Sequence, residues 1–134
     1  MTLMKNIILT LICFVLSGTI AMAQEVQTGK ASYYGKKFHG RRTSNGSIYH
    51  IDSLTCAHRT YSFGTLLKVR NVKNGKEVIV KVNDRGPFIT GRIIDLSYTA
   101  AKEIGMLSAG VVNVEVTKVG FVPNKKKEKR VRNN

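Results

Sequence analysis

Residues 78–88 read Val-Ile-Val-Lys-Val-Asn-Asp-Arg-Gly-Pro-Phe, and residues 92–97 read Arg-Ile-Ile-Asp-Leu-Ser. Each segment contains a short run of β-branched residues, which predicts a strand, and the Gly-Pro pair predicts a turn that ends the first strand. Asp84 and Arg85 are therefore expected where a strand leaves its sheet. Because loops at strand ends commonly carry binding and catalytic groups, this stretch is the candidate functional site.

Further short strands are expected on both sides of this stretch. Runs rich in Val, Ile and Tyr occupy residues 29–34, 66–72, 77–82, 93–96 and 111–119. Asn74-Gly75 separates two of these runs and predicts a tight hairpin with positive φ angles. Residues 97–106 predict one helix, capped by Ser97 and ended by Gly105. Many strands and one short helix in a chain of this length indicate an all-β fold, a small closed barrel.

The first 23 residues have the order of a secretory signal peptide. Lys5 precedes an apolar run at 7–16, and Ala-Met-Ala at 21–23 ends the segment. A membrane helix is the alternative, but the run is shorter than the roughly 20 apolar residues that a bilayer requires. We expect cleavage after Ala23 and export to the periplasm or cell envelope. Cys13 lies inside the apolar run and follows Thr-Leu-Ile rather than small residues, so a lipid anchor is not expected.

The rest of the chain has room for one domain. We expect a short linker at 24–28, a barrel domain at 29–120 and a disordered basic tail at 121–134. The chain carries 22 Lys and Arg against 8 Asp and Glu, a formal net charge of +14. A basic tail attracts anionic surfaces without specificity, so an anionic wall or membrane surface is its expected partner in an exported protein. Nucleic acid is not expected, because the tail has no aromatic residues to stack on bases.

Cofactors, metals and disulfides are not expected. Removal of the signal peptide leaves Cys56 without a second cysteine, and burial as a small apolar residue is the favoured interpretation over a reactive thiol. His39, His50 and His58 are separated by eleven and eight positions, which matches no metal-ligand motif. We expect the protein to be a monomer.

Five short motifs occur along the chain. They are Ala-Ser-Tyr-Tyr-Gly at 31–35, Phe-His-Gly at 38–40, Thr-Ser-Asn-Gly at 43–46, Thr-Cys-Ala-His at 55–58 and Asn-Asp-Arg-Gly-Pro at 83–87. With these motifs the chain resembles the rare lipoprotein A family, the septal-ring lytic transglycosylases of bacterial cell walls, over residues 29–119. The resemblance implies a six-stranded double-psi β-barrel with one short helix. It also implies endolytic cleavage of peptidoglycan glycan strands, including strands stripped of stem peptides, to 1,6-anhydro-N-acetylmuramic acid ends.

Asp84 is the principal catalytic candidate, because it matches the family's Asp in the Asn-Asp-Arg-Gly-Pro motif. Cleavage of a glycosidic bond requires a proton for the leaving oxygen, so a partly buried carboxyl with a raised pKa suits this position. In lytic cleavage the 6-hydroxyl of N-acetylmuramic acid attacks its own ring, so one carboxyl can give a proton and then take one. Turn capping through the neighbouring backbone is the structural alternative for Asp84.

Ser47 and His50 occupy positions where the family's active members have Glu and Asp. Ser47 carries no charge and His50 titrates near neutral pH, so neither simply replaces a carboxylate. Both are candidates for substrate binding. Their presence favours an alternative function, a glycan-binding module that locates the wall without cutting it.

Four further residues complete the candidate site. His58 matches the family's Thr-Ala-Ala-His motif and is either a catalytic residue that orients Asp84 or a structural histidine. Tyr34, Arg85 and Arg92 are candidate substrate-binding residues, through sugar stacking and through contacts with carboxylates or N-acetyl oxygens. Asp95 is expected to stabilise the barrel, by pairing with Arg92 or by bonding to backbone at the start of the helix.

Overall fold

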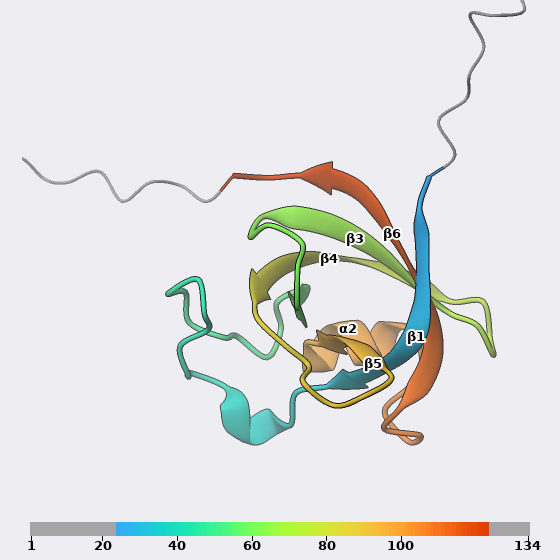
Figure 1. Ribbon diagram of the computed structural model, residues 1–134. Helices are drawn as coiled ribbons and strands as arrows, with labels where there is room; N and C mark the ends of the chain where they lie inside the picture. Colours follow the sequence, from blue (N-terminus) through green and yellow to red (C-terminus); the bar gives the residue numbers. More distant parts are fainter. Residues whose placement is uncertain (1–23, 124–134) are drawn as a thin grey trace, which may run out of the picture.

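Within residues 24–123, which the computed structural model describes, six strands close into a barrel in the order β1-β5-β2-β4-β3-β6 (Figure 1). The strands are β1 (Val26–Tyr33), β2 (Thr55–His58), β3 (Thr65–Asn71), β4 (Glu77–Asp84), β5 (Arg92–Leu96) and β6 (Val112–Phe121). A 3-10 turn, η1 (Lys36–Phe38), and one short helix, α2 (Tyr98–Glu103), complete the described elements. The expected six-stranded all-β barrel with one short helix is confirmed.

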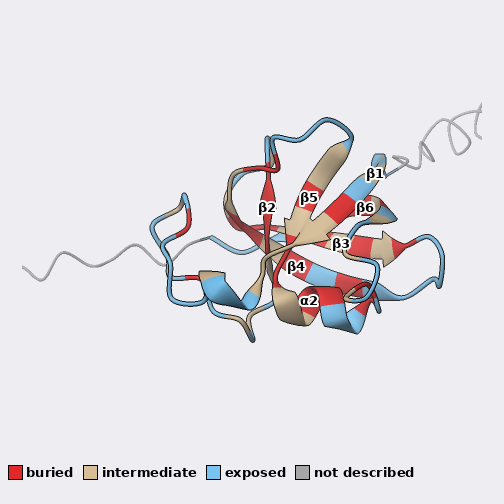
Figure 2. Cartoon of the chain, turned by 90° about the horizontal axis from the view of Figure 1, so that it is seen from below, coloured by how far each residue is buried: buried red, intermediate tan, exposed pale blue. Residues whose placement is uncertain are grey.

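Alternating side chains build the core of the barrel. In β3, Leu67 and Val69 are buried and their neighbours are partly exposed; in β4, Val78, Val80 and Val82 are buried. The banding along these strands is visible in Figure 2. Side chains of successive strand residues point to opposite faces, so each strand places one row inside the barrel and another outside. Burial of apolar surface at roughly 25 cal/mol per Å² supplies the main stabilisation.

Two parallel pairings make the barrel different from a simple meander. β1 pairs in parallel with β5, and β2 pairs in parallel with β4, whereas the remaining neighbours are antiparallel. A parallel pair requires a long connection between its strands. Between β1 and β5 the chain passes through β2, β3 and β4, and residues 34–54, which join β1 to β2, project beside the barrel (Figure 1). This segment brings the Thr-Ser-Asn-Gly motif to the end of β4.

Several local expectations need correction. β2 was not expected as a strand, because three of its four residues are buried and it shows no alternation. In the hairpin, Gly75 has a φ of 73°, but the φ of Asn74 is not positive. The Gly75 N–H donates to the Asn71 carbonyl at 2.8 Å. The loop is thus longer than a two-residue turn. The helix covers Tyr98–Glu103 rather than 97–106, although Ser97 caps it as expected.

The barrel also extends beyond its expected bounds. β1 begins at Val26, inside the segment expected as a linker, and β6 ends at Phe121. The Val122 N–H then donates to the Gly64 carbonyl at 2.8 Å. The expected signal peptide at 1–23 and positions 124–134 of the expected tail lie outside the described residues. Among residues 24–123, no helix is long and apolar enough to cross a membrane.

Candidate active site

Three neighbouring strands bring Asp84 and Asp95 to one face of the barrel. Ala57 of β2 is the register partner of Asp84 in β4 and also of Asp95 in β5. On its other side, Asp95 is paired with Ser32 of β1. In β2 and β5 the residues that alternate with this row, Cys56, Ile94 and Leu96, belong to the hydrophobic core, and a register shift between Cys56 and Ala57 brings Asp84 of β4 into the same row. The row therefore lies on the outer face of the barrel wall, where two carboxyl groups flank one small methyl side chain.

Hydrogen-bond donors surround the Asp84 carboxyl group. Tyr34 Oη donates to Oδ2 at 2.6 Å, and the hydroxyl and backbone N–H of Ser44 donate to Oδ1 at 2.6 and 2.9 Å. The Arg85 N–H donates to the same Oδ1 at 2.9 Å, so Asp84 also caps its own turn. Burial raises the pKa of Asp84, but these hydrogen bonds favour the carboxylate and leave the pKa below its ordinary value. The sequence favoured a raised pKa for this carboxyl, and that expectation is wrong.

Two cavities meet at Asp84. One has a volume of about 380 Å³ and is lined by Ser32, Tyr33, Tyr34, Phe38, Asp84, Arg85, Gly86, Pro87, Phe88, Ile89, Arg92 and Asp95. The other, of about 260 Å³, is lined by Tyr34, Phe38, Arg41, Arg42, Thr43, Tyr49 and Asp84. Tyr34, Phe38 and Asp84 line both. An extended chain molecule can thus contact protein on both sides of the Asp84 carboxylate.

His58 does not line either cavity and is only 2% exposed. Its Nδ1 accepts hydrogen bonds from the N–H groups of Thr60 and Tyr61 at 3.2 and 3.1 Å, and its Nε2 lies 2.9 Å from Gln27 Oε1. Burial, followed by the charges of Arg85 and Arg59, lowers the pKa of His58 to about 4. The ring is therefore neutral near pH 7, and both of its nitrogens already have partners.

Arg85 joins the His58 turn to the site. Its Nη1 donates to the carbonyl oxygens of His58 and Tyr61 at 3.1 and 2.7 Å. Its guanidinium group lies 3.9 Å from the centre of the Phe63 ring, a cation–π contact. Arg85 lines the larger cavity, yet most of its binding capacity is used within the protein. Arg92 lines the same cavity, and its carbonyl oxygen accepts from Arg59 Nη2 at 2.6 Å.

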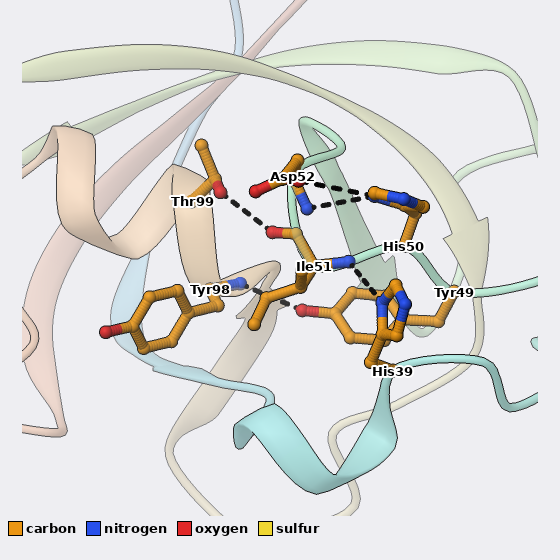
Figure 3. Close-up of polar contacts among 7 residues, drawn as sticks. All are labelled: His39, Tyr49, His50, Ile51, Asp52, Tyr98 and Thr99. Carbon is orange, nitrogen blue, oxygen red and sulfur yellow. Dashed lines mark hydrogen bonds and ion pairs between the residues drawn. The ribbon is translucent and has the colours of Figure 1, made fainter.

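Ser47 and His50 lie on the connection between β1 and β2, and both are exposed. Ser47 Oγ donates to Asn45 Oδ1 at 2.6 Å. Figure 3 shows the surroundings of His50, whose Nδ1 accepts from the Asp52 N–H at 3.2 Å and whose ring centre lies 4.8 Å from that of His39. Neither residue lines the cavities that meet at Asp84. The structure thus brings together Tyr34, Asp84, Arg85 and Arg92, but not Ser47 or His50.

Three residues at the site were not among the sequence candidates. Ser44 supplies two donors to Asp84, and Phe88 lines the larger cavity with 81% of its surface exposed. Asp95 bonds to the Ser32 hydroxyl rather than to Arg92 or to helix backbone, so the expected structural partners were wrong. Burial raises the pKa of Asp95. Alternation in Ile-Ile-Asp-Leu was an available signal, because apolar neighbours on the core side turn Asp95 outward.

The comparisons define the class of protein. A family model described as "Lytic transglycolase" matches residues 26–116, and the chain belongs to this family of double-psi β-barrels. It is 58% identical over 90 residues to the endolytic peptidoglycan transglycosylase RlpA of Vibrio cholerae serotype O1, a match that covers 67% of this chain. It is 48% identical over 103 residues to the protein of the same name from Campylobacter jejuni, covering 77% of this chain. The chain spans 34% and 38% of the length of these two relatives.

Solved structures agree with the fold. The chain resembles an expansin of Clavibacter michiganensis with a TM-score of 0.57 and 25% identity, over 75% of this chain and 53% of that one. It also resembles Streptomyces papain inhibitor, with a TM-score of 0.59 and 24% identity, over 72% of this chain and 96% of that one. The second likeness concerns the fold alone. Cys56 is buried, as expected.

Proposed function

We propose that this barrel is the catalytic domain of an exported endolytic peptidoglycan transglycosylase, which acts in the periplasm or cell envelope. Its substrate is the glycan strand, and its products end in 1,6-anhydro-N-acetylmuramic acid. The observation that carries the proposal is the Asp84 carboxylate, which lies where two cavities meet in a chain of the lytic transglycolase family. The relatives from Vibrio cholerae and Campylobacter jejuni are endolytic peptidoglycan transglycosylases by name, which supports the same substrate.

Asp84 suits the part of the reaction that removes a proton. In lytic cleavage, the 6-hydroxyl of N-acetylmuramic acid attacks C1 of the same sugar and loses its proton. Four hydrogen bonds keep Asp84 ionised, and an ionised carboxylate within reach of a hydroxyl can accept that proton. Because the nucleophile belongs to the substrate, the reaction does not require a second carboxylate to activate water, as an ordinary glycosidase does.

Other residues of the cavities can bind the strand. Tyr34 lines both cavities beside Asp84, and Arg92 adds a positive charge to the larger one. The exposed ring of Phe88, at the edge of the larger cavity, offers a flat apolar surface for a sugar ring. In a strand without stem peptides, N-acetylmuramic acid carries a free carboxylate on its lactyl group, which an arginine can bind. Ser47 and His50 do not line this surface, so direct contacts with the sugars at the reaction centre are not assigned to them.

Mass spectrometry of reaction products tests the function. Purified sacculi and amidase-treated, peptide-free glycan are incubated with the wild-type protein, with Asp84→Asn and with Asp52→Asn. Asp52 is a matched control, because its side chain is 80% exposed and lines neither cavity. We expect soluble fragments with 1,6-anhydro ends from the wild type and the control, and none from Asp84→Asn.

The alternative is a glycan-binding module without catalytic activity. It predicts that none of the three proteins releases anhydro products, while all three co-sediment with glycan. Phe88→Ala then helps to define the binding face: we expect weaker co-sedimentation of this variant, because the stacking surface is lost. Products without anhydro ends would indicate hydrolysis instead and would contradict the proposed reaction.

A further inference from the structure

Asp95 is a second carboxyl group on the wall of the cavity that contains Asp84. The pairing of strands fixes the positions of the two residues, because each is a register partner of Ala57 on the strand between them. Two interstrand spacings separate their backbones, roughly 10 Å. Ala57 between them is fully buried and does not line the cavity, whereas both aspartates line it. Carboxyl groups can therefore reach into one cavity from two sides.

The surroundings of the two carboxyl groups differ. Four donors converge on Asp84 from Tyr34, Ser44 and Arg85. Asp95 has one donor, the Ser32 hydroxyl from β1. Arg92, on the same strand as Asp95, is the cation that acts on it, and Asp84 is the anion that faces it from β4. Burial and the negative charge of Asp84 both favour the protonated form of Asp95, and together they exceed the effects of Ser32 and Arg92.

We propose that Asp95 is the second catalytic residue of this site: it protonates the departing glycosidic oxygen, while Asp84 accepts the proton of the attacking 6-hydroxyl. This assignment rests on the proposed lytic function. It removes a difficulty of a single-carboxyl scheme, in which Asp84 would have to begin the reaction protonated in spite of four donors around it. Pairs of carboxyl groups whose environments favour opposite protonation states are typical of glycosidic bond cleavage.

The proposed step is balanced without water or any other reactant. The bond between C1 of N-acetylmuramic acid and the oxygen of the next sugar breaks; that oxygen keeps the bonding electron pair and takes the proton of Asp95. The 6-hydroxyl oxygen forms the new bond to C1, and its proton passes to Asp84. One strand then ends in a 1,6-anhydro sugar, and the other begins with a free hydroxyl. Transfer of the proton from Asp84 back to Asp95, directly or through solvent, restores the starting state.

Substrates with different leaving groups separate the two roles. In peptide-free glycan the leaving group is a hydroxyl oxygen of the next sugar, which requires a proton to depart. A 2,4-dinitrophenyl β-glycoside of the N-acetylglucosamine–N-acetylmuramic acid disaccharide has a leaving group that departs without one. We expect Asp95→Asn to lower glycan cleavage by about 100-fold or more, the range of general acid catalysis, and to lower cleavage of the aryl glycoside by less than about tenfold. Asp84→Asn is expected to lose activity on both substrates.

Folding and pH dependence serve as further readouts. The side-chain amide in Asp95→Asn keeps an oxygen that can accept from Ser32, so the variant is expected to fold, and its activity on the aryl glycoside reports this directly. Wild-type glycan cleavage is expected to fall on the alkaline side of its pH profile, as the acid loses its proton, and this limb is expected to be absent when Asp95→Asn cleaves the aryl glycoside. Asp52→Asn is the control for the loss of a negative charge outside the cavities.

Three outcomes would overturn the assignment. Wild-type rates of glycan cleavage by Asp95→Asn would show that Asp95 donates no proton. Equal losses on both substrates would assign Asp95 to binding or structure, and activity of Asp84→Asn on the aryl glycoside would reverse the two roles. Failure of the wild-type protein to form anhydro products from either substrate would instead refute the proposed function, together with this assignment.

Discussion

Acid is expected to destabilise the barrel through His58. The ring is buried, and its pKa is about 4 in the folded protein against an ordinary value of 6.5. Between these two values the unfolded chain binds a proton that the folded protein does not, so the free energy of unfolding falls as the pH falls. The shift corresponds to about 3 kcal/mol at most, at about 1.4 kcal/mol per pH unit. This contribution is complete above pH 6.5 and is lost as the pH approaches 4.

Urea denaturation measured at a series of pH values tests this expectation. His58→Asn is the matched variant, because its Oδ1 can replace Nδ1 as the acceptor for the Thr60 and Tyr61 N–H groups but does not titrate. Asp95 acts in the opposite direction: because its pKa is raised, the folded protein binds a proton at a higher pH than the unfolded chain does. Its contribution to the free energy of unfolding therefore grows as the pH falls. Both proteins retain Asp95. The difference between their slopes therefore isolates His58.

The wild type is expected to lose about 2 to 3 kcal/mol more than His58→Asn between about pH 7.5 and pH 4.5. Equal slopes for the two proteins would refute the reasoning, because they would mean that the imidazole titrates alike in the folded and unfolded states. A wild type that gains stability relative to the variant on acidification would mean that His58 is charged in the fold. Either result would also remove the basis for a neutral, structural His58 beside Arg85.

Tyr34→Phe removes one donor from Asp84, and we expect the pKa of this carboxyl to rise towards its ordinary value, as measured by carbon NMR of the side chain; an unchanged pKa would contradict the role of the hydroxyl. Gly64→Ala is expected to destabilise the barrel by about 3 kcal/mol or more, because its φ is +97° and a Cβ would lie 2.3 Å from a backbone carbonyl oxygen. Gly91→Ala, with a φ of +84° and open space around it, is the control and should cost about 1 to 2 kcal/mol in thermal denaturation. Burial raises the pKa of the Cys56 thiol, so a thiol reagent at neutral pH is expected to label it only as fast as the protein unfolds, and immediate labelling would contradict its burial.

The strands that alternate were predictable, whereas the short buried one was not. Val78, Val80 and Val82 repeat at every second position, and that pattern predicts one buried face. In β2, Cys56, Ala57 and His58 are all buried. Cys56 belongs to the barrel core, while the Tyr61 ring and the Arg85 guanidinium group lie against His58. No period of two remains in such a strand. A resemblance through motifs supplied the closed six-stranded topology that periodicity could not.

The grouping of side chains around Asp84 was predictable from the sequence, but the pairing of Asp84 and Asp95 with one residue of β2 was not. Asp84, Tyr34 and Arg92 come together as expected, because they follow or lie within strands that meet at one part of the barrel wall. Asp95 was assigned a structural role, since sequence alone does not reveal that one residue of β2 is paired with both carboxylates. The pKa of Asp84 was expected in the wrong direction for a similar reason: three of its four donors belong to Tyr34 and Ser44, which lie 50 and 40 positions earlier in the chain.

Ser47 affects Asp84 through the shape of a loop rather than through charge. Its hydroxyl and N–H donate to Asn45 Oδ1 at 2.6 and 3.0 Å, and the Thr43 hydroxyl donates to the same oxygen at 2.7 Å. These bonds hold the turn that contains Ser44, which donates twice to Asp84. A neutral residue at position 47 is thus compatible with an ionised Asp84. The missing acidic side chains therefore weigh less against catalysis than the sequence suggested, because the second carboxyl group that the proposed chemistry uses, as an acid, is present at position 95.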